Sequence, residues 1–416
     1  MTGTAAAVEN SPIRRLADWS AARLRDLAAE YETPLYVIDI ERVRENAARL
    51  REAFPDAAID YAVKANARRP VLEAIAEAGF GAECASAGEV VRACEAGFSD
   101  VRYTAVNPPS RDLDRVVELA DDYDITITIG ALDTLDRLEE RGWSGSLYVR
   151  VNPDIGVGHH TKVRTGTDPK FGIPAGRAVA AVAEADERGF TVEGIHAHAG
   201  SGILDSEDLA AHRALVERLS ELAGEIADAG IVIDAVSIGG GFGVPYRDSE
   251  APLDLDALAR ATREAFSADA RLGIEPGRYC VADAGVLLTT VNTMKPTPET
   301  TVVGVDAGMT VLARPALYDA FHEIRSLAAD SGGRETVEAT IAGPVCESSD
   351  VLGRDRALPA PERGDLFAIG NAGAYGYEMA NTYNSRPRPA VVALDGADAE
   401  RCVRRETIAD LGRYER

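Results

Sequence analysis

The feature that most constrains the fold is an eightfold alternation of short apolar runs and amphipathic stretches between residues 58 and 276. The short runs are typical of strands, and the stretches between them place apolar residues at i, i+3 and i+4, as helices do. Eight such units in about 220 residues predict a closed parallel barrel. An open doubly wound sheet is disfavoured because the first run leads into YAVKANARRP, which lacks a glycine fingerprint. The predicted strands are 58–65, 81–86, 101–106, 124–130, 146–153, 191–199, 235–240 and 271–276.

The texture changes after about residue 283, where short strand-like segments are punctuated by Gly and Pro. The predicted fold class is therefore α/β, with a (β/α)8 TIM-type barrel and a C-terminal mainly β domain. We place the barrel at 35–282 and the β-rich domain at 1–34 and 283–416. The stretch TPLYVID is expected to add a strand to the β-rich domain, and YDAFHEIRSL is expected to be its long helix.

Composition and charge exclude several classes of protein. The 416 residues suit a large barrel plus a second module, and 46% apolar residues can form a sizeable core. With 44 basic and 68 acidic residues the net charge is −24, which should repel nucleic acids and anionic membranes. No apolar run approaches the roughly 20 residues of a membrane-spanning helix, and the N-terminal residues show no signal peptide.

Cysteine and lysine usage bear on the cellular setting. The five cysteines are odd in number and form no CxxC pair, so we expect no disulfide framework, no metal site and a cytoplasmic location. Only four of the 44 basic residues are lysines. A lysine-poor acidic surface suits a protein that works in high salt, and we therefore hypothesise a halophilic source.

Polar side chains gather at the predicted carboxyl ends of the barrel strands, where reactive groups lie in this fold. Lys64 follows the first strand, His196 and His198 end the sixth, and Glu275 ends the eighth. A lysine at a strand end is often only a surface residue. A partly desolvated lysine at a barrel mouth can instead form a Schiff base with an aldehyde cofactor, and this chain has few lysines.

Two glycine-rich segments, HAGSG and SIGGGFG, follow neighbouring strands. Flexible turns look alike, but the later strands of a barrel are its usual phosphate site, and backbone N–H groups there can bind an anion. Gly277 and Arg278 would add a third strand end. Glu275 is either a rim ion pair or an acid that keeps a proton on a pyridine nitrogen. His198 is equally consistent with stacking on a cofactor ring and with an ordinary hydrogen-bonded histidine.

The β-rich domain carries three denser strings, LARPALYDAFHEI, AGPVCESSDVLG and GNAGAYGYEMANTYNSRP. Arg314 and Tyr318 are four residues apart and should share a helical face, with Arg314 able to bind a carboxylate in a forked geometry. Cys346 precedes Glu347 in a polar loop. A buried structural cysteine is the common case, but this setting favours a proton donor.

Seven motifs in order, from about residue 33 to 388, are very specific. They are YAVKAN, HAHAGSG, SIGGGFG, EPGR, RPALYDAFHE, GPVCESSD and GAYGYEMANTYNSRPRP. Together they resemble the diaminopimelate decarboxylase family. This family comprises pyridoxal-phosphate (PLP) enzymes of the alanine-racemase-like barrel class, the group IV decarboxylases.

The resemblance implies roles for particular residues. Lys64 would hold PLP as an internal aldimine, Glu275 would pair with its pyridine nitrogen and His198 would stack on its ring. Cofactor phosphate contacts would come from Ser201, Gly240, Gly241, Gly277 and Tyr375, and Arg278 would also bind the cofactor. Substrate contacts would come from Arg278, Arg314, Tyr318, Glu347 and Tyr375. The family also implies a head-to-tail homodimer with shared active sites, into which the partner subunit would contribute Cys346 and Glu347.

The implied reaction is decarboxylation of meso-2,6-diaminopimelate to L-lysine and CO2 through a PLP external aldimine, the last step of lysine biosynthesis. Lys64, His198 and Cys346 would be catalytic, with Cys346 protonating the carbanion. No metal is implied. Two departures from the family pattern concern the pocket loops: Glu83 and Cys84 stand where an aspartate-bearing segment is usual, and His159 and His160 are adjacent.

Rival functions remain open at this point. Ornithine, arginine and carboxynorspermidine decarboxylases lack a distal zwitterion to bind, and their relatives tend to carry Asp after the loop cysteine. An amino-acid racemase would want arginine at the position of Glu275. A catalytically inactive regulatory relative would lack Lys64 or Cys346. A metal-dependent barrel hydrolase would need acidic partners for the HxH pair at other strand ends.

Overall fold

The computed structural model describes residues 12–158 and 165–415, and the chain divides into two compact units. The barrel unit comprises Asn46–Val244 and Leu253–Cys280, and the sheet unit comprises the described residues of Met1–Glu45, Pro245–Pro252 and Val281–Arg416. The domain limits given above remain a prediction, because a division by contacts describes compactness rather than independent folding. His159 and His160 lie outside the described residues.

Eight parallel strands close the barrel, which confirms the predicted fold class. Each strand pairs with the next along the chain, and the circle closes where Gly273 of the last strand pairs with Ala58 of the first. All eight predicted strands are present. They are β2 (Ala58–Ala62), β3 (Gly81–Cys84), β4 (Val101–Tyr103), β5 (Ile125–Ile129), β6 (Leu147–Asn152), β9 (Val192–His196), β11 (Ala235–Ser237) and β12 (Arg271–Ile274).

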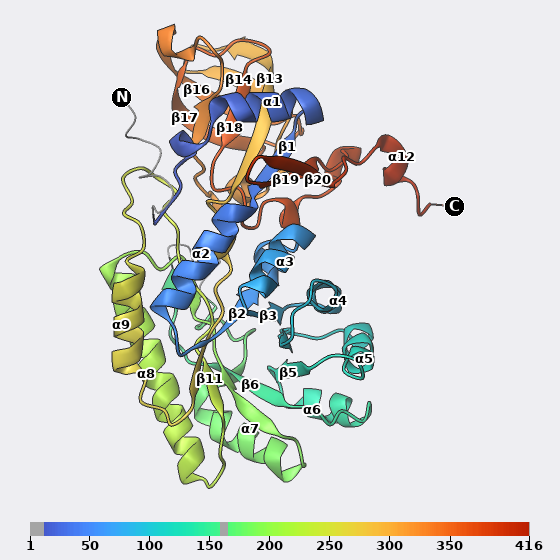
Figure 1. Ribbon diagram of the computed structural model, residues 1–416, viewed down its shortest axis with the longest axis vertical. Coiled ribbons are helices and arrows are strands. Elements are labelled where there is room, and N and C mark those ends of the chain that lie inside the picture. Colours follow the sequence, from blue (N-terminus) through green and yellow to red (C-terminus); the bar gives the residue numbers. More distant parts are fainter. Residues whose placement is uncertain (1–11, 159–164, 416) are drawn as a thin grey trace. The chain divides into compact units, whose positions relative to one another are not determined.

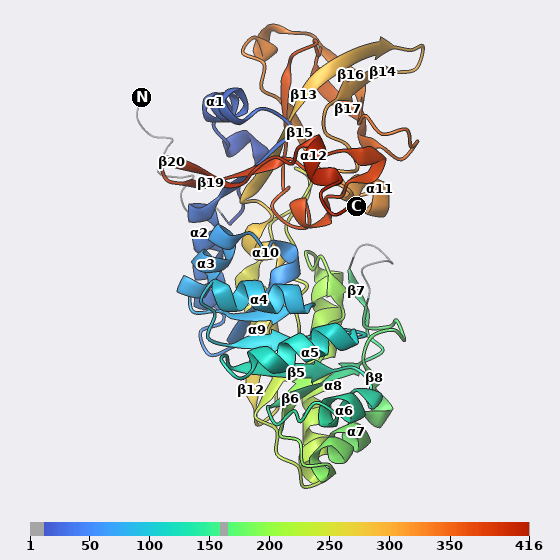
Figure 2. The same ribbon diagram turned by 90° about the vertical axis from the view of Figure 1, so that its right-hand side faces the viewer.

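Amphipathic helices follow the strands, and Figure 2 shows α4, α5 and α6 stacked along one side of the barrel. The helices between strands are α3 (Arg69–Glu77), α4 (Ala87–Glu95), α5 (Ser110–Leu119), α6 (Asp133–Glu139), α7 (Ala175–Glu187), α8 (Ser206–Asp228) and α9 (Leu255–Ala265). The longest, α8, begins where Asp205 accepts the backbone N–H groups of Glu207 and Asp208. These three acids also stabilise the positive end of the helix dipole.

Short elements complete the barrel unit. Two lie beside the strand ends that carry the glycine-rich segments, β7 (Val157–Gly158) and β10 (Gly200–Ser201), which pair in parallel. β8 (Ile173–Pro174) pairs in parallel with the end of β6, and the 3-10 turn η2 (Val63–Ala65) follows β2. Helices α2 (Ile40–Ala53) and α10 (Arg278–Val281) span the limits between the units in sequence.

The sheet unit is built around β1 (Leu35–Asp39) and the long β13 (Gly285–Pro296). β1 is antiparallel to β13 and parallel to β19, so the TPLYVID stretch adds a strand to this sheet as expected. The order is β17-β16-β14-β13-β1-β19-β20, with β18 on β13 and β15 on β18. The remaining strands are β14 (Thr301–Val305), β15 (Ile324–Ser326), β16 (Thr336–Ala342), β17 (Val351–Pro359), β18 (Leu366–Ile369), β19 (Ala390–Asp395) and β20 (Asp398–Val403).

The prediction of a long helix in YDAFHEIRSL was wrong. Helix α11 (Arg314–Tyr318) ends at Tyr318, because Asp319 takes a left-handed conformation with φ 52°. Residues 324–326 form β15, in which Ile324 and Ser326 are buried and Arg325 is partly exposed. That alternation has the period of a strand, and pairing with β18 satisfies the backbone. Other helices of this unit are η1 (Leu16–Asp18), α1 (Ala21–Tyr31), η4 (Ser331–Gly333), η5 (Tyr377–Met379), η6 (Tyr383–Ser385) and α12 (Ile408–Leu411).

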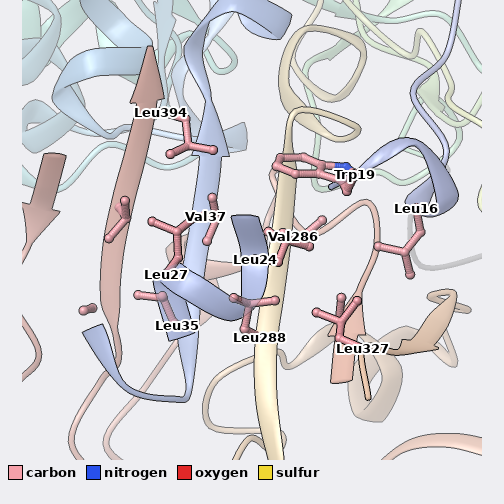
Figure 3. Close-up of a cluster of buried hydrophobic side chains, with 13 residues drawn as sticks. Leu16, Trp19, Leu24, Leu27, Leu35, Val37, Val286, Leu288, Leu327 and Leu394 are labelled. Carbon is pink, nitrogen blue, oxygen red and sulfur yellow. The ribbon is translucent and has the colours of Figure 1, made fainter. Parts of the chain in front are cut away.

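The core of the sheet unit forms where α1 packs on the sheet (Figures 1 and 3). Leu24 and Leu27 of α1 join Leu35 and Val37 of β1 and neighbouring apolar side chains of β13 and β19. Alternate residues of β1 point the other way, and the buried Tyr36 donates its hydroxyl to the Val311 carbonyl at 2.8 Å. In the described part of the chain, no helix combines the length and apolar character needed to cross a membrane.

Candidate active site

Lys64 lies in the turn η2, two residues beyond the end of β2 at Ala62, whereas the predicted strand ran to residue 65. Its Nζ is 2.5 Å from Oε2 of Glu83, at the end of the neighbouring strand β3. The register explains this pair, because Ala62 of β2 lies opposite Glu83. The Glu83 side chain is 3% exposed and that of Lys64 is 41% exposed. The amine is therefore held by a buried acid while remaining accessible.

Glu275 follows β12 and is buried among side chains from three other strands. Its Oε1 accepts from the Ser237 hydroxyl at 2.8 Å and from Arg102 at 3.2 Å. Its Oε2 lies 3.0 Å from Nε2 of His196. Burial alone would raise the pKa of Glu275, but His196 and Arg102 lower it below its ordinary range. Glu275 is therefore an anion at neutral pH.

His198 is fixed by the glycine-rich turn after β11. Its Nδ1 accepts the Gly240 N–H at 3.2 Å. Burial, reinforced by the nearby Lys64 charge, lowers the pKa of His198 to about 3. The imidazole is therefore neutral at pH 7. Gly240 is required here, since a Cβ would lie 2.2 Å from the Glu275 carbonyl oxygen. Gly241 adopts a φ of 106°, which favours glycine.

Ser201 and Arg278 meet beside these glycines. The Ser201 hydroxyl lies 3.3 Å from Nε and 3.2 Å from NH2 of Arg278. Gly277 lets the chain pass close to β2, because a Cβ would lie 3.0 Å from that of Ala62. A guanidinium and a hydroxyl among backbone-exposing glycines suit a phosphate. With an amine and a buried anion on the same rim, the donor set fits PLP.

In the sheet unit, Arg314 and Tyr318 are the first and last residues of the short helix α11. Arg314 is 4% exposed. It donates to the Tyr246 hydroxyl at 2.8 Å, and its NH1 lies 3.1 Å from Nε2 of His322. Nδ1 of His322 is 2.8 Å from the Gly370 carbonyl, so the ring proton lies on that side and Nε2 accepts. No local sequence pattern connects Tyr246 and His322 with Arg314.

Cys346 and Glu347 are exposed in the loop between β16 and β17. Nδ2 of Asn384 lies 3.4 Å from the Cys346 sulfur, and Tyr383 donates its hydroxyl to Glu347 at 2.5 Å. Tyr375 lies in the loop after β18 with a φ of 55°, a strained conformation for an aromatic residue. Strain of this kind is common at functional sites.

Asp350 anchors this loop and was missed from the sequence. It is 2% exposed, and it accepts the backbone N–H of Met309 at 2.5 Å and that of Val345 at 2.6 Å. Gly308 and Gly343 leave room for its carboxylate, because a Cβ on either would lie 2.6 Å or less from it. Within residues 12–158 and 165–415, no cluster of three or more His, Cys, Asp or Glu could hold a metal.

Comparison with known proteins fits this donor set. The family model "Pyridoxal-dependent decarboxylase, pyridoxal binding domain" matches residues 40–282. The chain belongs to the PLP-dependent decarboxylases of the barrel class. A diaminopimelate decarboxylase from Methanothermobacter thermautotrophicus is 41% identical over 93% of this chain and 92% of its own. One from Deinococcus radiodurans is 39% identical over 93% and 97%.

A solved structure gives the same result. The diaminopimelate decarboxylase from Helicobacter pylori, complexed with L-lysine, superimposes with a TM-score of 0.86 at 31% identity, over 94% of this chain and 99% of that one. Within the class, this chain is a member of the diaminopimelate decarboxylase family.

Proposed function

We propose that this chain removes one carboxylate of meso-2,6-diaminopimelate to give L-lysine and CO2, with PLP as its cofactor. The observation that carries this function is the pair of groups on the barrel rim: an accessible amine, Lys64, and a buried anion, Glu275. When bound, PLP accepts the electron pair of the broken Cα–carboxylate bond into its ring. The chain itself has to hold the ring, protonate it and orient the substrate.

The barrel side chains hold the cofactor. Lys64 would hold PLP through its aldehyde, and Glu83 lies beside the amine and would pair with it when it carries a charge. Glu275, ionised at neutral pH, keeps a proton on the ring nitrogen. The neutral imidazole of His198 would contact the ring. Phosphate contacts come from Ser201, Gly240, Gly241, Gly277, Arg278 and Tyr375.

The substrate's distal end carries both an ammonium and a carboxylate. Glu347 suits the ammonium, and Arg278 and Arg314 suit the carboxylate in a forked geometry. Tyr318 and Tyr375 complete these contacts. Cys346 delivers a proton to the substrate carbon that loses CO2.

The enzyme works as a homodimer with shared active sites, in the cytoplasm. Cys346 and Glu347 reach the site of the partner subunit. The exposure of both side chains in one chain supports this arrangement, because a proton donor needs surroundings that exclude water.

The decisive assay compares CO2 release from meso-diaminopimelate, ornithine and arginine. The wild-type enzyme should release CO2 from diaminopimelate and yield L-lysine, with far lower kcat/KM on the other two. Faster turnover of ornithine or arginine would overturn the substrate assignment. Borohydride should fix PLP to Lys64 in the wild type and not in Lys64→Ala; unchanged trapping in that variant would refute the role of Lys64.

A further inference from the structure

The barrel interior contains a buried acid that the proposed mechanism does not use. Asp60 lies in the middle of β2 and is 1% exposed. Its Oδ2 is 2.8 Å from NH2 of Arg102, which comes from β4. Among the described residues no donor makes a well-directed hydrogen bond to either Asp60 oxygen. Gly81 of β3 leaves room for the carboxylate, because a Cβ there would lie 2.3 Å from Oδ1.

Arg102 connects this acid to Glu275. Its NH2 faces Asp60, and its NH1 donates to Oε1 of Glu275 at 3.2 Å. The guanidinium carbon lies 4.0 Å from the ring centroid of Tyr148, which covers one face. All three charged side chains are 4% exposed or less. The guanidinium is therefore held in one orientation between two buried carboxylates.

The charges of Arg102, Glu275 and Asp60 explain why Asp60 matters for the charge felt near Glu275. Arg102 and Glu275 alone would be neutral together. A fixed cation beside Glu275 would then oppose a proton on any nearby ring nitrogen, since charges interact strongly in a poorly solvated interior. Among these three side chains, Asp60 restores one net negative charge and leaves the Arg102–Glu275 hydrogen bond in place. Lys64 and Arg150 also act on Glu275, and both of these cations interact with Glu83.

We propose that Arg102 and Asp60 are positioning residues for Glu275: Arg102 fixes its carboxylate, and Asp60 offsets the charge of Arg102, so that Glu275 retains the negative charge that keeps the PLP ring nitrogen protonated. This inference rests on the proposed role of Glu275. It assigns a function to two side chains that lie inside strands, below the rim.

The ionisation of Asp60 is compatible with this role. Burial raises the pKa of Asp60 to about 7. The positive charge of Arg102 lowers this pKa, and the negative charges of Asp100, Glu275 and Glu83 raise it further. Asp60 is therefore an anion above neutral pH. That is the range in which a ring nitrogen needs help to keep its proton.

The test uses holoenzyme reconstituted with PLP carrying 15N in the ring, and follows the ring nitrogen by NMR as a function of pH. Asp60→Asn should lower the pH at which the nitrogen loses its proton by about one to two units, because Arg102 is no longer offset. Arg102→Gln should raise that midpoint. The double variant Asp60→Asn/Arg102→Gln should return it toward the wild-type value, and kcat should be lower in Asp60→Asn than in the wild type.

Asp283→Asn is the matched control. Asp283 is also a buried acid, paired with the 1%-exposed Arg42 at 2.7 Å, but it belongs to the sheet unit. This variant should lose stability and leave the titration of the ring nitrogen unchanged.

The outcomes separate the inference from the function it rests on. The inference is overturned if the ring nitrogen of Asp60→Asn loses its proton at the wild-type pH. It is also overturned if the double variant has the same midpoint as Asp60→Asn. Either result would mean that Asp60 and Arg102 form an ion pair with a structural role only. If Asp60→Asn does not fold, an unraised midpoint in Arg102→Gln overturns it equally. If Glu275→Gln leaves the ring protonated like the wild type, the proposed role of Glu275 fails instead.

Discussion

Glu275 and Cys346 are assigned to one reaction, but the molecule holds them in different ways. Glu275 is 5% exposed and receives contacts from β4, β9 and β11, whose register fixes each partner. Cys346 is exposed in a loop of the sheet unit, where the Asn384 side chain contacts its sulfur. The barrel thus fixes an ionised group by strand geometry, whereas the loop depends on a few side chains.

This difference has a physical consequence. A strand residue is placed by many backbone hydrogen bonds, so losing one neighbour changes its electrostatics more than its position. A loop residue is placed by specific anchors, so losing an anchor moves it. Replacements around Glu275 should therefore alter protonation, and replacements around Cys346 should alter geometry.

The largest effect should follow the loss of the loop thiol. Cys346→Ser should lower kcat by about 10²- to 10⁴-fold, as expected for a proton donor, with little change in cofactor binding. Steady-state CO2 release and cofactor titration measure both. Cys402→Ser, on β20, is the control and should retain full activity. An unchanged kcat in Cys346→Ser would remove this residue from the chemistry.

Mixing variants tests whether the barrel of one subunit works with the loop of another. Lys64→Ala keeps an intact loop and Cys346→Ala keeps an intact barrel rim. If sites are shared, an equal mixture should recover about a quarter of wild-type activity, because half of the dimers are mixed and each has one complete site. No recovery after subunit exchange would contradict shared sites.

A smaller effect should follow the loss of the loop anchor. Asp350→Asn replaces an acceptor of two backbone N–H groups by an amide that can accept at only one atom. The loop should shift, lowering kcat by about 10- to 100-fold, since small displacements of a reacting group have that cost. The alkylation rate of Cys346 should change in parallel.

Asp365→Asn is the control for Asp350→Asn. Asp365 is also a buried acid of the sheet unit, and it accepts the Glu362 N–H at 2.8 Å. The Asp365→Asn variant should be less stable than the wild type, with an unchanged kcat. Equal loss of kcat in both variants would mean that Asp350 acts through overall stability alone.

The sequence predicted most of the barrel because the necessary information is local. Lys64, His198 and Glu275 follow apolar runs with clear period, and the fold brings strand ends to one rim. Asp60 and Arg102 were missed because a single charged residue inside a short strand does not alter that period. Their pairing across β2 and β4 becomes visible only when the barrel closes.

The loop was harder to predict. Asn384 and Cys346 are 38 residues apart, and no local pattern links them. The same holds for β15, whose three residues lie in a stretch with apolar spacing compatible with a helix. Pairing with β18 decided its structure, and such non-local pairing overrides local propensity.

A still smaller effect is expected on the pH dependence of stability, through a buried neutral histidine of the barrel unit. His212 of α8 is 2% exposed, and its Nε2 lies 2.8 Å from the Thr262 hydroxyl. Burial lowers the pKa of His212 to about 4. Between pH 6.5 and 4 the unfolded chain therefore binds a proton that the folded chain does not. The free energy of unfolding should fall as pH drops through this window, by up to about 3 kcal/mol from this group.

Chemical denaturation at a series of pH values from about 4 to about 7.5 measures this dependence, because this range includes the ordinary pKa of histidine. His212→Gln keeps a donor for Thr262 and cannot titrate, so its unfolding free energy should vary less with pH. An identical slope in wild type and His212→Gln would show that His212 is solvated or charged in the folded barrel.

Salt should have the smallest effect on catalysis, because it screens exposed charges strongly and buried charges much less. Arg188 pairs with Asp136 and Glu139, whose side chains are 68% and 48% exposed, whereas the side chains of Arg102 and Glu275 are each 4% exposed. Raising NaCl from about 0.1 M to about 2 M shortens the screening length to a few ångströms, which weakens the self-repulsion of a chain with a net charge of −24. Tm should therefore rise, while the pH at which the ring nitrogen titrates stays constant because the buried pair is screened much less. A Tm that does not fall at low salt would count against the high-salt hypothesis, and a ring titration that shifts with salt would place the Glu275 cluster in contact with solvent.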